Sequence, residues 1–375
     1  MNRRLALWTA FAATVIARGA SAQEVTIGYQ GLPYKMSGES NTGVQVAEGV
    51  LLHLGAGAEA GYDSNVFYSN TAEVSSPIVR TSLFGEMTNA TRTGAATRMT
   101  FDLRAGVTYR RYQSDDVVSS NGQDVKNAWM PTAGLALSAG GGQFGFGIAD
   151  TFARIEDPPY NPSALLITRY NNQASAEGRW APGGGRLTAT LRYMNMLDIF
   201  QGDYTYASAN YNYFMLDAAW KWLPKTAVFV NVQQGYVFYL NDAEAQLNNK
   251  HSSFPLTATA GLRGLLTEKT SAILQLGYMN GFYSGPQSTG GFLGSTYAEL
   301  SFSVRPTMLS RIVAGYRHDF TNAVIAGFSY NEAVYASYVQ QIAGRLALDL
   351  SGRYVHRNFG GLFVDPTQAG RNDDF

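Results

Sequence analysis

Residues 101–109 read Phe-Asp-Leu-Arg-Ala-Gly-Val-Thr-Tyr, and apolar or small side chains occupy every second position. Because successive side chains of a β-strand point to opposite faces, this stretch predicts a strand with one apolar and one polar face. The same alternation returns at residues 173–180, 186–193, 256–264, 298–305, 311–317 and 346–353. In each stretch the charged residues fall on the opposite parity from the apolar ones, which predicts a sheet with a continuous apolar face.

The connections between these stretches alternate in length. Tight turns are predicted, about 40 residues apart, near residues 93–94, 140–141, 183–184, 224–225, 268–269, 306–307 and 344. Longer polar connections are predicted at residues 113–126, 156–161, 241–253, 284–291 and 319–322. Two long strands, one short turn and one longer loop form the hairpin unit of outer-membrane barrels, whose short turns face the periplasm. A propeller blade would need four strands in the same length and a recurring signature.

We therefore predict an all-β fold, a transmembrane antiparallel outer-membrane β-barrel. About 15 strands are expected, at residues 50–62, 77–89, 96–111, 127–139, 143–155, 166–181, 185–197, 205–222, 226–239, 254–266, 270–283, 292–305, 309–318, 323–340 and 345–357. Such lengths suit tilted membrane strands better than a soluble sandwich, whose strands average about five or six residues. Because single-chain bacterial barrels have an even strand number, about 16 to 18 strands are expected if the chain lacks its closing strand or strands. A miscount, or a contribution from residues 24–29, is the alternative.

The N-terminus predicts export. Residues 1–22 begin with Arg3 and Arg4, continue through an apolar stretch at 5–16 and end in Ala20-Ser21-Ala22, which is typical of a signal peptide cleaved after Ala22. The apolar run is too short for a membrane-spanning helix. We assign residues 23–49 to an N-terminal periplasmic segment and residues 50–375 to the barrel.

Aromatic residues gather near the predicted strand ends, among them Tyr109, Trp180, Trp220, Tyr278 and Tyr354. Amphipathic rings at strand ends are typical of the girdles where membrane barrels meet lipid headgroups.

Composition excludes several classes of function. The 28 basic and 28 acidic residues balance, which argues against a nucleic-acid partner, and the absence of cysteine excludes thiolate metal sites and thiol enzymes. The histidines, His53, His251, His318 and His356, show no zinc-protease spacing, and the glycine-rich run at 55–61 lies within a strand pattern rather than before a helix. We expect no cofactor, no metal and no enzyme; the nearest catalytic candidate is His251 beside Ser252 and Ser253.

If the apolar parity faces lipid, the charged parity lines the lumen. The predicted inner residues are Asp102, Arg104, Glu177, Arg179, Arg192, Asp217, Arg263, Glu299, Arg305, Arg311, Arg317, Asp349 and Arg353. Arginine is in excess among them. Such a wall can tune the selectivity of an aqueous channel, or its members can simply pair across strands.

The motif at Gly61, Tyr62, Asp63, Ser64 and Asn65, followed by Val66 and Phe67, resembles the opening signature of the β-barrel porin 2 family. The late stretch 370–375 resembles the linker with which such proteins enter another strand. The resemblance implies an outer-membrane barrel of an exopolysaccharide export system of the Wzx/Wzy type, which works with a periplasmic export protein.

The sequence is therefore compatible with three functions. The first is export of a surface polysaccharide through a hydrated lumen, with outer-membrane lipid, a periplasmic export protein and the polymer as partners. The second is a general or substrate-selective diffusion porin. The third is a structural or adhesive barrel, for which the predicted loops are short.

Overall fold

The computed structural model describes residues 44–63, 66, 74–89, 99–118, 125–157, 167–284, 296–322, 326–343, 346–363 and 372–374. The predicted signal peptide, most of the segment 23–49, and Ser64 and Asn65 of the family-like motif lie outside these ranges.

Seventeen strands in the described ranges form one sheet. They are β1 (Val44–Ala47), β2 (Val50–Asp63), β3 (Ser76–Thr88), β4 (Met99–Tyr112), β5 (Asn127–Gly141), β6 (Phe144–Asp157), β7 (Ile167–Trp180), β8 (Leu187–Phe200), β9 (Ala209–Leu223), β10 (Thr226–Tyr239), β11 (Leu256–Leu265), β12 (Thr270–Asn280), β13 (Thr296–Val304), β14 (Ser310–Asn322), β15 (Ala326–Ala343), β16 (Leu346–Phe363) and β17 (Asn372–Asp374). Three short helical segments lie between them: η1 (Gly183–Gly185), η2 (Gly202–Ala207) and α1 (Asp242–Leu247).

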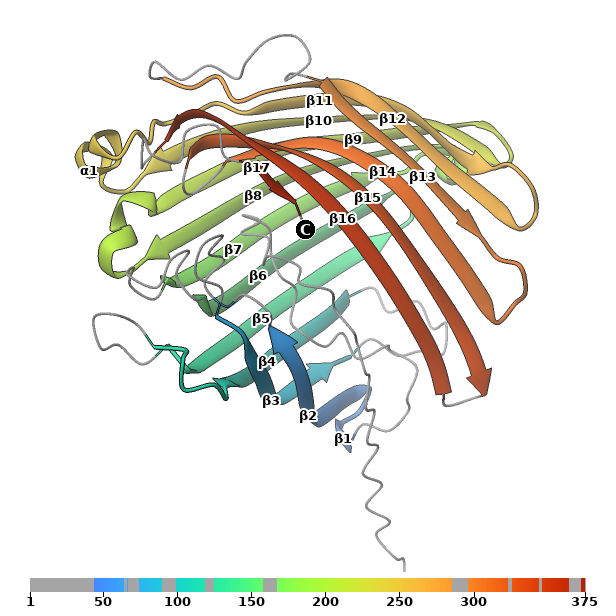
Figure 1. The fold of residues 1–375 in the computed structure, drawn as a ribbon. Helices are drawn as coiled ribbons and strands as arrows, with labels where there is room; N and C mark the ends of the chain where they lie inside the picture. The colour runs from blue at the N-terminus through green and yellow to red at the C-terminus, as the bar shows by residue number, and fades with distance from the viewer. Residues whose placement is uncertain are drawn as a thin grey trace, which may run out of the picture.

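Each strand pairs antiparallel with the next strand in the chain. The sheet curves round strongly, with β1 and β2 at one edge and β15 to β17 at the other (Figure 1). The antiparallel β-barrel that the alternation predicted is confirmed.

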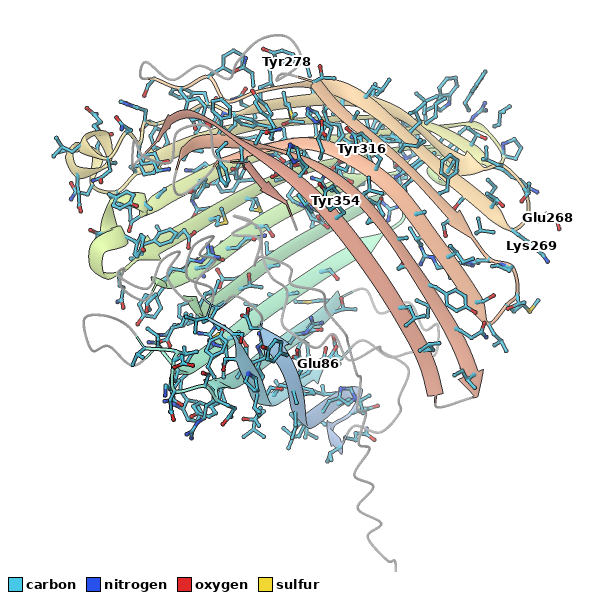
Figure 2. All side chains as sticks on the ribbon, viewed as in Figure 1. Glu86, Glu268, Lys269, Tyr278, Tyr316 and Tyr354 are labelled. Carbon is cyan, nitrogen blue, oxygen red and sulfur yellow. The ribbon has the colours of Figure 1, made fainter. Side chains whose placement is uncertain are left out.

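The two ends of the strands differ. One end, here called the turn end, carries short connections such as residues 142–143, 224–225 and 266–269. The opposite end, here called the loop end, carries longer connections, among them the one that contains α1 (Figure 1). Figure 2 shows Glu268 and Lys269 at the tip of the β11–β12 turn, far from α1.

The fifteen predicted strands coincide with β2 to β16; the structure adds two short strands, and the prediction of a connection at residues 319–322 was wrong. Strand β1 falls in the stretch assigned to the N-terminal segment, and β17 falls in the stretch 370–375 that resembles a linker, where Asn372 pairs with Asn358. Residues 319–322 are not a connection. They belong to β14, because they continue its register with β15 as far as Asn322 opposite Phe328.

One face of the sheet is apolar and exposed. Leu54, Phe146, Leu191, Leu276 and Leu350 are each more than half exposed, and all of them lie on the outward parity of their strands. Soluble proteins bury such a band, so its exposure over many strands matches the lipid-facing surface of a membrane barrel.

Aromatic rings mark both borders of this outward face. Trp180, Trp220 and Trp222 are exposed near the turn end, and Trp129 is exposed near the loop end, where its ring centroid lies 4.7 Å from that of Tyr109. Tyr278 stands off the outer side of the sheet at the top of Figure 2. These positions fit the two aromatic girdles of outer-membrane barrels.

No helix among the described residues is long and apolar enough to cross a membrane.

Candidate functional site: the polar inner wall

The face opposite the apolar band carries the charged residues. Directly opposed residues of neighbouring strands share a face, and the register brings Glu86 opposite Arg104 and Glu177 opposite Arg192. The same register, followed from strand to strand, places every predicted inner position on this face. Arg305 continues the alternation just beyond the end of β13. We call this face the inner wall; that it lines an open lumen stays a prediction.

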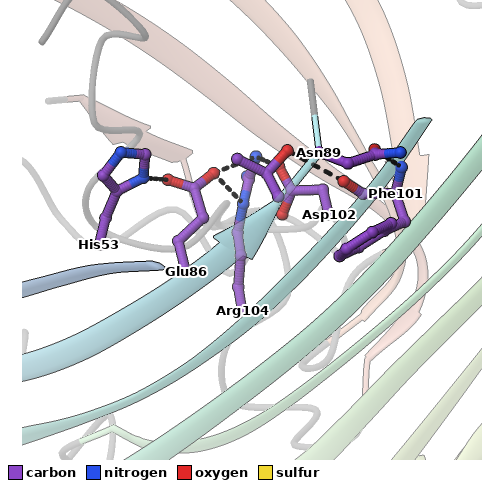
Figure 3. A network of polar contacts seen from close by, with 7 residues as sticks. His53, Glu86, Asn89, Phe101, Asp102 and Arg104 are labelled. Carbon is purple, nitrogen blue, oxygen red and sulfur yellow. Dashed lines mark hydrogen bonds and ion pairs between the residues drawn. The ribbon is translucent and has the colours of Figure 1, made fainter. Parts of the chain in front are cut away.

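The densest group on the inner wall lies near the turn end of β2 to β4 (Figure 3). Glu86 stands between two basic side chains, with Oε2 3.8 Å from His53 Nδ1 and Oε1 3.2 Å from Arg104 Nη2. The same Arg104 Nη2 donates to Asp102 Oδ2 at 2.5 Å. The guanidinium therefore bridges two carboxylates that would otherwise repel each other.

Beside this group, Asn89 at the end of β3 extends the pairing of this strand with β4. Its Oδ1 accepts from the backbone N–H of Phe101 at 2.6 Å (Figure 3). Its Nδ2 donates to the carbonyl of Met99 at 3.1 Å. The amide thus continues the β3–β4 ladder by one further rung, and this fixes Asp102 and Arg104 relative to Glu86.

Other ion pairs on the inner wall lie between adjacent strands or along one strand. Glu59 binds Arg80 at 2.9 Å, Glu177 binds Arg192 at 2.6 Å, and on β14 Asp319 binds Arg317 at 2.7 Å. Sequence reasoning missed His53, Glu59, Arg80, Glu86 and Asp319. The signal was present for His53, because it alternates with Leu52 and Leu54.

Some arginines of the inner wall have other partners. The guanidinium of Arg263 lies 5.5 Å from the ring centroid of Phe229, and Arg311 Nε donates to Ser303 Oγ at 3.1 Å. In the described part of the chain, Arg179, Arg263, Arg305 and Arg311 make no ion pair with a carboxylate.

Several aromatic rings of the inner wall lie flat against it. A methyl group added at Gly261 would come within 2.5 Å of the Phe229 ring, and one at Gly315 within 2.4 Å of the Tyr335 hydroxyl. Each ring therefore covers a glycine of the neighbouring strand, where any side chain would push it away from the wall.

The loop end of β7 to β10 is closely packed on its inner side. Met196, Ala209, Tyr211 and Val237 are buried together, with Tyr213 and Tyr239 against them. We call these residues the tyrosine cluster. Beside it, Arg169 Nη1 lies 3.1 Å from Asp198 Oδ2, and these side chains are only 6% and 0% exposed. The guanidinium of Arg169 also lies 5.7 Å from the ring centroid of Phe200.

The connections beyond this end bury titratable groups. Burial lowers the pKa of Lys250, in the connection after α1, to about 7. Burial also raises the pKa of Tyr206 in η2 above its ordinary value. By contrast, a hydrogen bond from Lys126 lowers the pKa of the exposed Asp115.

The outward face has a polar interruption on β6 to β9 that the sequence analysis did not anticipate. Asn172 Nδ2 donates to both carboxylate oxygens of Asp150, at 3.1 and 3.2 Å. Nearby, Asn195 Nδ2 donates to Asn210 at 2.7 Å and to Asn212 at 3.0 Å. These side chains satisfy one another's hydrogen bonds, as polar groups away from water must.

The structure also places two other stretches that the sequence analysis singled out, the glycine-rich run and the stretch that contains Ser253. The glycine-rich run 55–61 lies inside β2, and the ring of Phe84 covers Gly55. Ser253, in the catalytic candidate stretch, is 1% exposed, and its backbone pairs with Val237.

Comparison with known proteins gives a fold-level likeness only. No family model matches the chain. No curated protein matches it either.

Among solved structures, the ferric yersiniabactin uptake receptor FyuA from Yersinia pestis aligns with a TM-score of 0.43 and 9% identity over 84% of this chain and 58% of that one. The ferric-catecholate import receptor Fiu from E. coli K12 gives 0.46 and 7% over 84% and 64%. OccAB4 from Acinetobacter baumannii gives 0.40 and 12% over 86% and 94%. The chain thus spans roughly three fifths of the two receptors. Its own strand lengths, its exposed apolar band and its polar inner wall are those of a bacterial outer-membrane β-barrel.

Proposed function

We propose that the barrel is a hydrated passage for hydrophilic molecules across the outer membrane. The observation that carries the proposal is the sidedness of the sheet: the face opposite the apolar band bears the ion pairs. Glu177 and Arg192 are still 41% and 42% exposed on that face, which supports a water-filled rather than a packed interior. A wall of strand-borne charges around water is how wide barrels conduct solutes.

The finer proposal is passage of a surface polysaccharide, with a periplasmic export protein at the turn end. Flat rings such as Phe229 and Tyr335 support it, because sugars present apolar faces as well as hydroxyl groups and an aromatic wall can contact both without tight binding. A general or substrate-selective diffusion porin would use the same wall and is the rival proposal. A structural or adhesive barrel would rely on its loops instead.

The test is a strain that lacks this gene beside a complemented control. Cell-surface and secreted polysaccharide are measured, and uptake of small sugars and amino acids is followed in parallel. Loss of polymer with normal uptake supports the export barrel. Slowed uptake with unchanged polymer overturns export and supports the porin. Normal polymer and normal uptake contradict both and leave the structural barrel.

A further inference from the structure

Basic residues crowd the turn end of β7 to β14. We call this group the basic arc: Arg179, Arg186, Lys221, Lys225, Arg263, Lys269, Arg305 and Arg311, all exposed. The acidic residues on the same stretch of the wall are Glu177, Asp217, Glu268 and Glu299.

The acidic residues do not neutralise the basic arc. Glu177 is bound by Arg192, which is not part of the arc. With the Asn231 amide turned so that its nitrogen faces Asp217, that nitrogen donates to Asp217 Oδ1 at 3.2 Å. Glu299 accepts a hydrogen bond from the Tyr297 hydroxyl at 2.7 Å. Lys269 Nζ donates to the Pro306 carbonyl at 3.1 Å, which leaves its charge uncompensated by an acid.

The rest of the wall has a different charge balance. On β2 to β4, Glu59, Glu86 and Asp102 face Arg80 and Arg104 within ion-pair distance. At the loop end, acidic residues occupy the described connections and strand ends, among them Asp115, Asp116, Asp157, Asp242 and Glu244. Among the described residues, basic side chains therefore outnumber acidic ones most clearly along this arc at one end of the sheet. Walls of low dielectric focus the field of such charges into the space they enclose.

The arc also presents its charges in fixed positions. Arg263 lies over the ring of Phe229, and that ring lies over Gly261. Arg311 is tied to the Ser303 hydroxyl. A guanidinium held in this way keeps N–H donors free for the oxygens of a carboxylate or phosphate group, and less side-chain entropy is lost when it binds.

We infer that the passage selects anionic cargo, and that the basic arc collects carboxylate- or phosphate-bearing molecules at its turn end. The inference names the substrate class of the passage and so rests on the proposed function. It covers small organic anions and acidic polysaccharides alike, because both present the same groups to the arginines.

The experiment uses the full-length protein in planar lipid bilayers under a KCl gradient. The wild type is expected to pass chloride severalfold more readily than potassium, and the preference should shrink between about 0.1 M and about 1 M salt as the charges are screened. The variant R179Q/R263Q/R305Q/R311Q is expected to conduct with a preference close to unity. The matched control R111Q/K126Q removes basic charge at the loop end and should keep the preference.

Cargo size is tested by blocking the current. An oligogalacturonate, which carries a carboxylate on each sugar, is added to each side in turn, with a neutral dextran of similar length as control. If the oligogalacturonate blocks the current from one side only, and the fourfold variant loses this block, the cargo is an acidic polymer. If small organic anions permeate and the oligogalacturonate does not block the current, the cargo is a small solute. A wild type that conducts without anion preference and is not blocked overturns the inference and leaves the passage standing. A folded wild type that passes no ion and releases no solute from liposomes overturns both.

Discussion

Strands β7 and β8 carry two ion pairs on the same inner face, at opposite ends and in opposite surroundings. Arg169 and Asp198, 3.1 Å apart, are 6% and 0% exposed beside the tyrosine cluster. Glu177 and Arg192, 2.6 Å apart, are 41% and 42% exposed near the turn end. The closer pair is the wetter one, so burial rather than distance separates their roles. A buried pair becomes costly when one partner is lost, whereas a solvated pair contributes little to stability and is free to act on a solute.

The largest expected effect is from Asp198→Ala. It leaves the buried Arg169 charge without its carboxylate, which should lower the free energy of unfolding by roughly 3–5 kcal/mol. Guanidinium unfolding in lipid vesicles, followed by the band shift on unheated gels, measures this loss. The matched change Glu177→Ala should cost less than about 1 kcal/mol. Equal losses in the two variants would show that burial does not distinguish the pairs.

The next effect is the pH dependence at the loop end. Because the pKa of Lys250 falls from 10.5 when unfolded to about 7 when folded, the unfolded chain binds more protons between these values. The free energy of unfolding should therefore be lowest below about pH 7 and rise by roughly a few kcal/mol up to about pH 10.5. Unfolding of the wild type and of Lys250→Met is measured at about pH 6.5 and about pH 9. A rise that persists in Lys250→Met would assign the pH dependence to other groups.

A smaller effect is expected where a ring covers a glycine. Gly261→Ala brings a methyl group within 2.5 Å of Phe229 and 2.4 Å of the Leu274 carbonyl, so both the ring and the strand backbone must shift, and the overpacking should cost about 1–3 kcal/mol. The change should also displace Arg263 and weaken anion preference in bilayers. Gly141→Ala is the matched control, because nothing lies within 4 Å of the added methyl group. An unchanged anion preference in Gly261→Ala, or an equal loss in the control, would contradict the role of the ring.

The smallest stability change, and the sharpest functional one, is expected from Glu177→Gln. The free energy of unfolding should change by under about 1 kcal/mol, because the pair is solvated. Removing the carboxylate frees Arg192, so preference for chloride should rise in the same bilayer measurement. A fall in preference would mean that Glu177 does not restrain the positive potential of the wall.

The alternation of apolar and charged residues was sufficient to predict β2 to β16 and the face on which Asp102, Arg263 or Arg317 lies. Strands β1 and β17, with Val44–Ala47 and Asn372–Asp374, are too short to show a period, so only their pairing reveals them. Residues 319–322 looked like a connection because they are mostly polar. In the structure Asp319 accepts a hydrogen bond from Asn331 across the ladder, which keeps the strand intact.

The alternation of apolar and charged residues could not predict which side chains of adjacent strands contact each other. Arg169 and Asp198 lie on adjacent strands but are not directly opposed, since Asp198 faces Asn171 in the register. Their pairing depends on a diagonal contact and on burial by Phe200 and the tyrosine cluster. Neither of these produces a repeating pattern in the sequence. The sequence showed the excess of arginine but not that basic residues gather at one end of the wall, because this depends on which ends of distant strands meet.

The rings that cover glycines place a constraint on how this sequence can diverge. Phe229 and Gly261, like Tyr335 and Gly315, occupy complementary volumes on adjacent strands. A larger residue at the glycine requires both a smaller ring and a shift of the neighbouring backbone carbonyl, Leu274 or Leu300, and a smaller residue at the ring leaves bare backbone. Homologous chains should therefore exchange these two positions together or keep both, so that a glycine and an aromatic residue one hairpin apart are inherited as a pair.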